Sequence, residues 1–442
     1  MKFINNNKKI RFIVGLLSFL AVTSCTFDEQ IDPNRPSLND VLSNASVSQL
    51  NNLVSAVEST MRNSLAIQTT ASGTLARELY LFDADPRNTS DLLGKGPNSS
   101  QLDNDSFYST AAFNSRYICI KNANVLMDAL KNTNSVNEQE KSGYRGFAKT
   151  IIAYELIQVL KSYNRARIDV SDPDNLGPFL EFDQAIIEVI KILDDAVVDL
   201  NNAGTQFKLM LSSGFDGFNT PQTFITFNKG IRAVATLYAG QSSESLDSLN
   251  DSFFDLNGDL NVGPKHVYSL NPGDFTNGLF KVPQQSGDQI IVHDSWINDA
   301  EAGDTRVTTK TALRPVPAQS SDDLNGANEI ALYASNISPI DMIRNEELIL
   351  VYAEASILAN NLADAVTALD VIRNAAGLPN YSGAVTADAL TTEMLNQRRY
   401  SLWAENHRMF DLRRYDLSNT LPIDRTGDEI FNVFPIPLSE NQ

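Results

Sequence analysis

Hydrophobic residues three and four positions apart run through most of the chain, which is the period of an amphipathic helix. The clearest run covers residues 181–202, where Ile186, Val189, Leu193 and Leu200 fall on one helical face. The same spacing predicts further helices over residues 46–61, 114–131, 140–162, 224–239 and 244–256. The pattern therefore predicts a mostly α-helical protein.

Residues 344–376 read as two helices joined by a short turn. Alanines at the positions where these helices would cross allow close approach, as in one tetratricopeptide unit, although no tandem repeat is visible. The helices expected at 224–239 and 244–256 form a second such pair. Gly240 and Gly377 stand where helices of these pairs should end.

Long segments rich in Gly, Pro, Asn and Asp separate the helices. They cover residues 83–106, 164–179, 203–223, 257–340 and 377–388. The segment 257–340 has little helical period and contains short apolar pieces such as Gln289–Val292. Connections of this length usually carry function or minor strands. The expected architecture is a helical scaffold that displays large loops.

The N-terminus has the pattern of a targeting signal. Residues 2–11 are basic, and residues 12–22 form an apolar run that is too short to span a bilayer. Val22-Thr23-Ser24-Cys25 is similar to the lipobox of bacterial lipoproteins. We expect residues 1–24 to be a signal peptide, Cys25 to be lipidated, and residues 25–45 to be a tether. The alternative is a plain secretory signal in which Cys25 is not modified.

Residues 46–442 are then expected to form a single helical domain, with residues 257–340 as its loop-rich insert. The formal net charge of the chain is −19, and it becomes −23 without residues 1–24, which carry four basic side chains and no acid. Such an excess of acid disfavours nucleic acid as a partner. Three scattered histidines and two cysteines offer no metal-binding spacing, so neither a metal nor a cofactor is expected. Cys119 lies in an apolar stretch and is expected to be buried and inert.

Charged residues are concentrated in the segment 397–414, QRRYSLWAENHRMFDLRR. On a continuous helix Glu405, Arg408, Asp411 and Arg414 follow at three-residue steps, so neighbours of opposite charge could pair. Arg398 and Arg413 would extend this charged lattice. One interpretation is a pair of catalytic carboxylates. We favour a structural ion-pair network, because every acid has an arginine within reach.

This segment resembles the C-terminal signature of the SusD/RagB family, approximately E-R-R-x-E-L-x-x-E-G-x-R-x-x-D-L-R-R. The matching residues are Arg398, Arg399, Leu402, Glu405, Arg408, Asp411, Leu412, Arg413 and Arg414. Gln397 and Asn406 depart from the pattern, standing where the signature has Glu and Gly. The ending Phe434–Asn441 and the runs Arg344–Ala355, Ile372–Gly377 and Tyr117–Asn124 are similar to further motifs of the family.

The resemblance implies a SusD-like helical fold with tetratricopeptide-like helix pairs, long ligand-binding loops and minor β structure. It implies an outer-membrane lipoprotein, anchored through its acylated cysteine, that faces the cell exterior. Members of the family capture nutrients for a SusC-like TonB-dependent transporter. Many bind oligosaccharides, and others bind peptides or other ligands. No catalytic residue and no cofactor is implied.

Sugars present apolar faces to aromatic rings and hydroxyls to polar side chains. The segment 77–88 offers both, through Arg77, Tyr80, Phe82, Asp85 and Arg87, and it lies where the family often places ligand contacts. Tyr80 and Phe82 alternate as in a strand and should share one face. That face could equally pack on the helices.

Trp296 is the second candidate, because it lies in a polar loop, and Tyr333 is a weaker one, as are Tyr268 and Phe218. A small satellite core is the alternative for Trp296. Trp403 lies within the family motif and is expected in the core.

Two other classes of protein remain open. A surface glycoside hydrolase would need two carboxylates flanking a cleft, and the acid pairs Asp83/Asp85 and Asp322/Asp323 are only neighbours in sequence. A helical scaffold that binds only protein is the other alternative.

Overall fold

The computed structural model describes residues 38–96 and 101–441. The predicted signal peptide, Cys25 and most of the predicted tether lie outside the described residues. Among the helices that are described, none has the length and apolar character needed to cross a membrane. The tether prediction needs one correction, because Leu38–Asn44 form a helix, α2, against α5.

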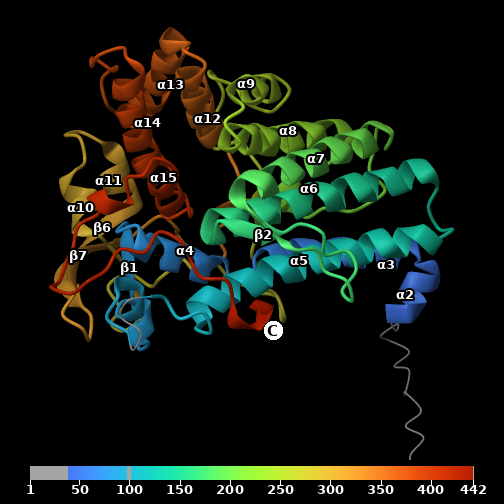
Figure 1. Ribbon diagram of the computed structural model, residues 1–442, viewed down its shortest axis with the longest axis horizontal. Coiled ribbons are helices and arrows are strands. Elements are labelled where there is room, and N and C mark those ends of the chain that lie inside the picture. Colours follow the sequence, from blue (N-terminus) through green and yellow to red (C-terminus); the bar gives the residue numbers. More distant parts are fainter. Residues whose placement is uncertain (1–37, 97–100, 442) are drawn as a thin grey trace, which may run out of the picture.

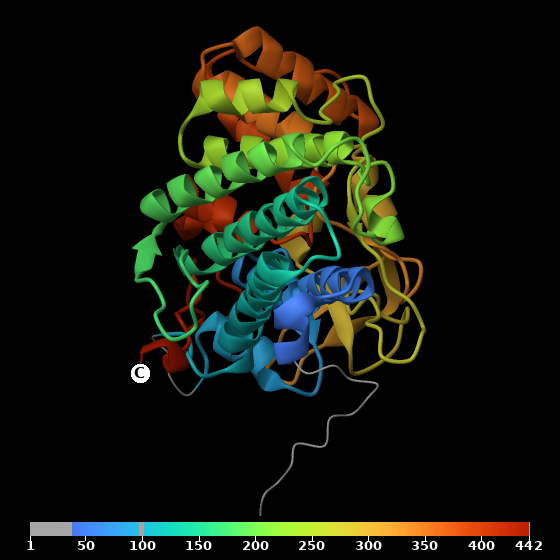
Figure 2. The same cartoon turned by 90° about the vertical axis from the view of Figure 1, so that its right-hand side faces the viewer.

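Five long helices form a stack in which each packs on the next (Figure 1). They are α3 (Val47–Met61), α5 (Phe107–Asn132), α6 (Glu138–Tyr163), α7 (Phe182–Asn201) and α8 (Pro221–Tyr238). Figure 2 shows that they follow sequence order from the bottom of the molecule upward. The largest apolar core lies between them, and it includes Cys119, which is fully buried as expected.

Local sequence sets where these helices begin and end. Ser46, Asn137 and Thr220 are N-caps whose side chains accept from the third backbone N–H of α3, α6 and α8. Satisfying these otherwise unpaired donors stabilises a helix start by about 1 kcal/mol. Gly240 has a φ of 74° just after α8, the left-handed conformation that glycine adopts at helix ends.

A second group of helices lies above the stack and beside it (Figure 1). It contains α9 (Ser242–Asn250), α12 (Asn345–Leu358), α13 (Leu362–Ala375), α14 (Ala387–Ser401) and α15 (Arg408–Arg414). The pairs α8–α9 and α12–α13 are the two helical hairpins expected from the sequence. Ala353, Ala365 and Ala368 are fully buried in the core that α12, α13 and α14 share, which confirms close packing between small side chains.

The loop-rich segment 257–340 contains most of the β structure. The main sheet has the order β1-β5-β7-β6 and all its pairs are antiparallel. Its strands are β1 (Leu79–Phe82), β5 (Gln289–Val292), β6 (Thr311–Gln319) and β7 (Asn325–Ile330). The helices α4 (Leu65–Leu75), α10 (Asp294–Asn298) and α11 (Thr305–Lys310) flank it (Figure 1). Two small ribbons pair β2 (Arg165–Arg167) with β3 (Phe179–Glu181) and β4 (Lys265–His266) with β8 (Ile340–Asp341).

The prediction of one continuous helix through residues 397–414 is wrong. Helix α14 ends at Ser401 and α15 starts at Arg408. Between them Ala404 and Asn406 have φ values of 62° and 60°, and such left-handed residues do not continue a helix. Helix α4 was not predicted, because its hydrophobic residues do not gather on one side: five polar residues and Gly73 interrupt them, and eight of its eleven residues are buried.

Candidate functional site

The charged residues of the C-terminal motif are held by ion pairs and hydrogen bonds inside the protein. Arg398 Nε donates to Asp411 at 2.8 Å, and Asp411 also accepts from Arg414 at 3.0 Å. Arg414 in turn contacts Glu354 on α12 at 2.7 Å. Burial opposes ionisation of Asp411, but Arg398 and Arg414 outweigh it and hold the pKa of this carboxyl below its usual value. An acid kept ionised in this way is a structural partner rather than a proton donor.

The remaining motif residues connect separate elements. Arg413 donates to the carbonyl oxygens of Leu160 and Lys161 at 3.2 and 3.0 Å, near the C-terminal end of α6, where helix carbonyls lack partners. Glu405 lies outside both helices and forms an ion pair with Arg344. Arg408 forms no direct ion pair within the described residues, and burial lowers its pKa, an effect that Arg399 strengthens and that Glu78 and Asp411 oppose. The motif is therefore a structural network, although its partners come largely from other parts of the chain.

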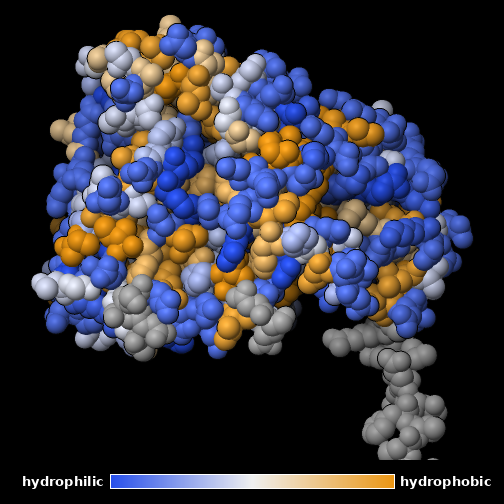
Figure 3. All heavy atoms as spheres, in the orientation of Figure 1, coloured by the Kyte–Doolittle hydropathy of each residue, from blue (hydrophilic) through white to orange (hydrophobic). Residues whose placement is uncertain are grey.

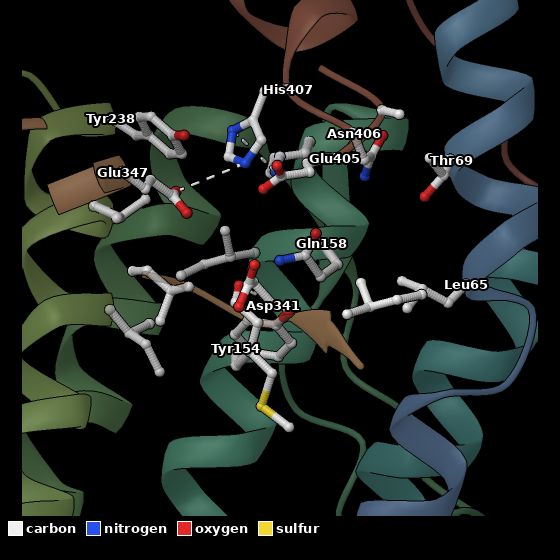
Figure 4. A pocket seen from close by; sticks show the side chains of 18 residues that line it. Leu65, Thr69, Tyr154, Gln158, Tyr238, Asp341, Glu347, Glu405, Asn406 and His407 are labelled. Carbon is white, nitrogen blue, oxygen red and sulfur yellow. Dashed lines mark hydrogen bonds and ion pairs between the residues drawn. The ribbon is translucent and has the colours of Figure 1, made fainter. Parts of the chain in front are cut away.

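A cavity lies beneath the segment that joins α14 to α15 (Figure 4). Figure 4 shows Glu405, Asn406 and His407 above it, Glu347 at its side and Gln158 and Asp341 below. Its volume is about 50 Å³. Small-molecule sites hold about 300–1,000 Å³, so the cavity is too small for a sugar or peptide.

Burial dominates the electrostatics of this cavity. It raises the pKa of Glu347 to about 7 and lowers that of Lys161 to about 8. It also lowers the pKa of His407 far below the usual value, an effect strengthened by the charges of Lys161 and Arg398. His407 Nδ1 lies 3.4 Å from Lys161 Nζ, and Nε2 lies 3.8 Å from Glu347. These groups face one another and stay out of contact with bulk solvent.

Three of the predicted ligand residues are buried in or beside the main sheet. Tyr80 and Phe82 do share one face of β1, as expected, and their rings are nearly parallel with centroids 6.0 Å apart. However, they are 3% and 6% exposed and pack with Leu93 and Ile291. The structure thus favours the packing alternative. Arg77 is 1% exposed and donates to the carbonyl oxygens of Pro422 and Glu429.

Tyr80 and Arg77 meet at a residue that the sequence did not single out. The Tyr80 hydroxyl donates to the carboxylate of Asp424, which also lies 3.0 Å from His293 Nε2 and 3.6 Å from Arg77 Nε. Burial of Tyr80, together with the charge of Asp424, raises the pKa of this phenol far above its usual value. The cluster fastens the segment around Asp424 over the edge of the sheet. It leaves neither Arg77 nor Tyr80 free to meet a ligand.

Trp296 needs the same correction. It is fully buried, its indole N–H donates to the carbonyl oxygen of Arg399 at 3.2 Å, and its ring lies 4.9 Å from that of Trp403. The satellite core, left open as the alternative, is what the structure contains, and Trp403 belongs to it as expected. Tyr333 is half-buried against the same cluster. A polar sequence neighbourhood did not reveal that the ring points inward.

Asp85 and Arg87 are the predicted residues that remain accessible. They stand at the start of η1 (Pro86–Asn88), where Asp85 is the N-cap and accepts from the backbone N–H of Arg87 at 3.0 Å. The Arg87 guanidinium contacts both carboxylate oxygens of Asp85, the shortest distance being 2.6 Å. It also lies 4.7 Å from the centroid of the Phe107 ring. The carboxylate and the ring hold an otherwise exposed guanidinium in one orientation.

Arg87 lines an open hollow of about 460 Å³ between η1, η2 (Asp91–Leu93) and the start of α5. We call it the Arg87 hollow. Its other polar residues are Ser90, Asp91, Lys95, Gln101, Asp103 and Tyr108. Its volume falls in the range of small-molecule sites, about 300–1,000 Å³. Figure 3 shows that hydrophilic atoms cover most of the face that Figure 1 presents, with hydrophobic patches standing separately.

The surroundings shift the pKa of two side chains in the Arg87 hollow. Partial burial raises the pKa of Asp91 above its usual value, against a hydrogen bond of 3.4 Å from the Tyr108 hydroxyl. Burial raises the pKa of Tyr108 to about 12, so this hydroxyl keeps its proton. It accepts from the backbone N–H of Asp103 at 3.0 Å. The hollow therefore offers fixed donors and acceptors with two basic and two acidic side chains.

Sequence reasoning did not single out Asp91, Lys95, Gln101, Asp103 or Tyr108. These residues belong to the predicted loop 83–106 or follow it directly, so the richness of that loop in polar residues was the available signal. Of the acids considered for catalysis, Asp83, Asp85 and Asp322 are engaged by other side chains. Asp83 accepts from Asn88, and Asp322 contacts Arg425 at 2.7 Å. Within residues 38–96 and 101–441, no group of three or more His, Cys, Asp or Glu is placed to hold a metal.

Comparison with known proteins agrees with this fold. A sequence model of the SusD family matches residues 295–439. The search among curated proteins found no match. A glycan-binding protein A from the surface of Bacteroides thetaiotaomicron, in complex with laminarihexaose, superposes with a TM-score of 0.67 at 13% identity, covering 89% of this chain and 97% of that one.

Two further solved structures are similar over comparable lengths. A SusD superfamily protein from Parabacteroides distasonis has a TM-score of 0.65 at 17% identity, covering 89% of this chain and 96% of its own. NanU from B. fragilis has a TM-score of 0.62 at 14% identity, covering 93% of this chain and 97% of its own. The resemblance seen in the C-terminal motif is confirmed, and the mostly α-helical, SusD-like fold is confirmed with it.

Proposed function

Since the chain carries the SusD family region and has the SusD-like fold, we propose that it is a cell-surface nutrient-binding protein that captures oligosaccharides and is not an enzyme. In this proposal the Arg87 hollow is where the ligand binds. The captured ligand then passes to a SusC-like TonB-dependent transporter in the outer membrane. Acylated Cys25 would hold the protein on the outer membrane, facing the cell exterior.

The observation that carries the proposal is the chemistry of the Arg87 hollow. Sugar hydroxyls both donate and accept hydrogen bonds, and the hollow presents donors from Arg87, Lys95 and Gln101 opposite acceptors from Asp91 and Asp103. Its charges balance, which suits a neutral ligand better than an ionic one. The surface glycan-binding protein A that shares this fold was solved with laminarihexaose, a neutral oligosaccharide.

Calorimetric titration of residues 26–442 with a panel of neutral oligosaccharides and peptides tests the proposal. We expect one glycan class to bind and Arg87→Ala to weaken its binding at least about tenfold, or about 1.4 kcal/mol. Arg165→Ala is a matched control, because Arg165 also lies over an aromatic ring, Phe179, and beside an acid, Glu181, but outside the hollow. Equal losses in the two variants would exclude the Arg87 hollow as the ligand site.

The same titration separates the alternatives. Binding of peptides but not glycans would make the protein a peptide binder of the same kind of uptake system. A glycoside hydrolase would release shorter sugars from the panel, and Asp91→Asn would stop that release because Asp91 has the raised pKa. We expect no shortened sugars from the unaltered protein. Binding to a transporter without any glycan or peptide would indicate a protein-binding scaffold.

Delivery of the ligand to a transporter and anchoring through Cys25 are tested with the full chain in cells. We expect the unaltered protein to sediment with the outer membrane and to co-purify with a TonB-dependent transporter. Cys25→Ser removes the thiol that would carry the lipid, so the variant should leave the membrane fraction while its soluble domain still binds ligand. A Cys25→Ser variant that stays membrane-bound would refute the lipid anchor.

A further inference from the structure

A second groove shares one lining residue, Met342, with the small cavity. It is bounded by the C-terminal half of α3, by residues 210–213 and by the chain that continues β4, and we call it the α3 groove. Its volume is about 430 Å³. None of its lining residues belongs to the Arg87 hollow. It is therefore formed by different elements and needs its own explanation.

The most ordered group in the α3 groove is Arg62, at the end of α3. Its Nη1 donates to the carbonyl oxygen of Val267 at 2.6 Å, and its Nη2 lies 2.8 Å from Asp274. The guanidinium also lies 5.7 Å from the Tyr268 ring centroid and 5.6 Å from that of Phe275. Four contacts thus fix a side chain that would otherwise have about 2 kcal/mol of rotamer entropy. Its Nε remains without a partner among the described residues.

Free hydroxyls stand on the two facing walls of the α3 groove. Ser55 and Ser59 come from α3, and Ser213 comes from the opposite loop. Their side chains make no hydrogen bond within the described part of the chain. None of these oxygens is buried without a partner, so each is open to solvent. Three unpartnered hydroxyls around one hollow offer both donors and acceptors to a bound molecule.

Apolar surface completes the α3 groove. Met210, on the loop wall, is 70% exposed, and Phe275, beside Arg62, is 39% exposed. The backbone N–H of Met210 donates to Asn51 at 3.2 Å, and that of Ser212 donates to Glu58 at 3.2 Å, so the loop wall is tied to α3. Met210 is an exposed apolar side chain of the groove lining and can contact the apolar face of a ligand, whereas Phe275 packs against Arg62 beside the groove.

The charges of the α3 groove balance. Arg62 and Lys265 are basic, Glu58 and Asp274 are acidic, and Arg62–Asp274 are paired with each other. Burial raises the pKa of Glu58 above its usual value, against hydrogen bonds from Ser212. Such a site has no net attraction for an anion or a cation. Free hydroxyls, an aromatic and thioether surface and balanced charge fit a neutral molecule that carries many hydroxyls.

We propose that the α3 groove is a second binding site, separate from the Arg87 hollow, and that it takes a neutral saccharide. The apolar face of a sugar ring would lie toward Met210. Its hydroxyls would exchange hydrogen bonds with Ser55, Ser59 and Ser213. The site does not depend on the Arg87 hollow, so it stands or falls independently of the proposed function.

Methyl NMR of the soluble domain, residues 26–442, tests the second site directly. The Met210 methyl group reports on the groove and can be assigned by Met210→Leu, since this side chain is largely exposed. The probes are laminarihexaose, maltohexaose and cellohexaose at millimolar concentration, and a neutral tetrapeptide of Ala and Ser. We expect at least one hexasaccharide to shift the Met210 resonance in a saturable way.

Two variants locate the effect. Ser213→Trp places a bulky ring in the groove from an exposed position and should abolish the shift. Ser382→Trp makes the same change at an exposed residue outside the groove and should leave it intact. Arg87→Ala should also leave it intact, even where it removes binding at the Arg87 hollow.

Three results would overturn the second site. The first is a Met210 resonance that no saccharide moves, and the second is a response to the tetrapeptide alone. The third is a saccharide response that disappears in Arg87→Ala, because it would trace all binding to the Arg87 hollow. Absence of glycan binding at the Arg87 hollow, with the Met210 response retained, would refute only the assignment of that hollow as a ligand site.

Discussion

The cavity beneath the C-terminal motif and the Arg87 hollow are built from the same kinds of side chain. Both contain basic residues, carboxylates and a tyrosine. In the cavity the space is about 50 Å³ and the surrounding charges are buried, whereas the hollow holds about 460 Å³ and Arg87 is 49% exposed. Residue type alone therefore does not separate a structural cluster from a candidate ligand site.

Solvent access explains the contrast. A charge taken out of water loses several kcal/mol of solvation and is tolerated only when partners surround it. Asp411 is such a charge, and Arg398 and Arg414 are its partners. A charge at the surface keeps its water and gains little from its neighbour. The buried network should therefore determine stability, and the open hollow should determine binding.

Breaking the buried network should have the largest effect on stability. Asp411→Asn keeps the size of the side chain but leaves Arg398 and Arg414 without their shared carboxylate. We expect the free energy of unfolding to fall by about 3–5 kcal/mol, measured by urea denaturation. The control is Asp128→Asn, which removes an exposed pair with Lys131 and should cost at most about 0.5 kcal/mol. Similar losses in both variants would contradict the contrast between buried and open charge.

Trp296→Ala tests whether Trp296, which the sequence placed in a loop, belongs to the core or to the ligand site. It removes a fully buried indole from between Tyr400 and Trp403. We expect a loss of about 3 kcal/mol in the free energy of unfolding. Titration of the folded variant should give an unchanged dissociation constant for the glycan. If the folded variant bound the glycan more weakly than the unaltered protein, Trp296 would belong to the ligand site.

A conservative change in the Arg87 hollow should leave stability alone. Arg87→Lys keeps the charge but loses the planar group that contacts Asp85 and Phe107 together. We expect glycan affinity to fall by about threefold to tenfold, or up to about 1.4 kcal/mol. Thermal unfolding should stay within about 0.5 kcal/mol of the unaltered protein. Full affinity in Arg87→Lys would show that charge alone is recognised.

The buried side chain of His266 should make the free energy of unfolding depend on pH. Burial, reinforced by the charges of Arg116 and Arg62, lowers the pKa of His266 to about 3. The unfolded chain therefore binds this proton more readily, and stability falls as the pH drops below about 6.5. Between about pH 6.5 and 5.5 this group should cost about 1 kcal/mol. The free energy of unfolding of His266→Phe, measured across this pH range, should lack the loss that His266 causes. Identical pH profiles in the variant and the unaltered protein would contradict a role for His266.

The sequence anticipated the fold better than the site. Helices such as α3 and α7 carry the apolar period along their length, and caps such as Ser46 of α3 and Asn137 of α6 mark helix starts locally. The break between Ser401 and Arg408 was missed, because Ala404 and Asn406 adopt left-handed conformations that residue identity does not require. Helix α4 escaped notice because tertiary contacts, not its own pattern, bury it.

In the candidate site, too, local sequence predicted some features and tertiary contacts decided others. Of the predicted ligand residues, Arg87 lines the hollow and Asp85 holds its guanidinium, whereas Arg77, Tyr80, Phe82 and Trp296 are buried. The alternation of Tyr80 and Phe82 identified a strand and a shared face correctly. It could not say which side of that face solvent occupies, because Ile291, Ala318 and Leu324 arrive from distant parts of the chain to cover it.

What the sequence by itself determined is the helical scaffold, its paired helices and the charged C-terminal motif, since periodicity, capping and spacing are properties of residues close together in the chain. What only the tertiary structure decided is which polar and aromatic side chains stay open to water. Arg87 and Arg398 look alike in sequence, and one is 49% exposed while the other is 1% exposed. Burial depends on segments hundreds of residues apart, and burial decides whether a charge supports the fold or meets a ligand.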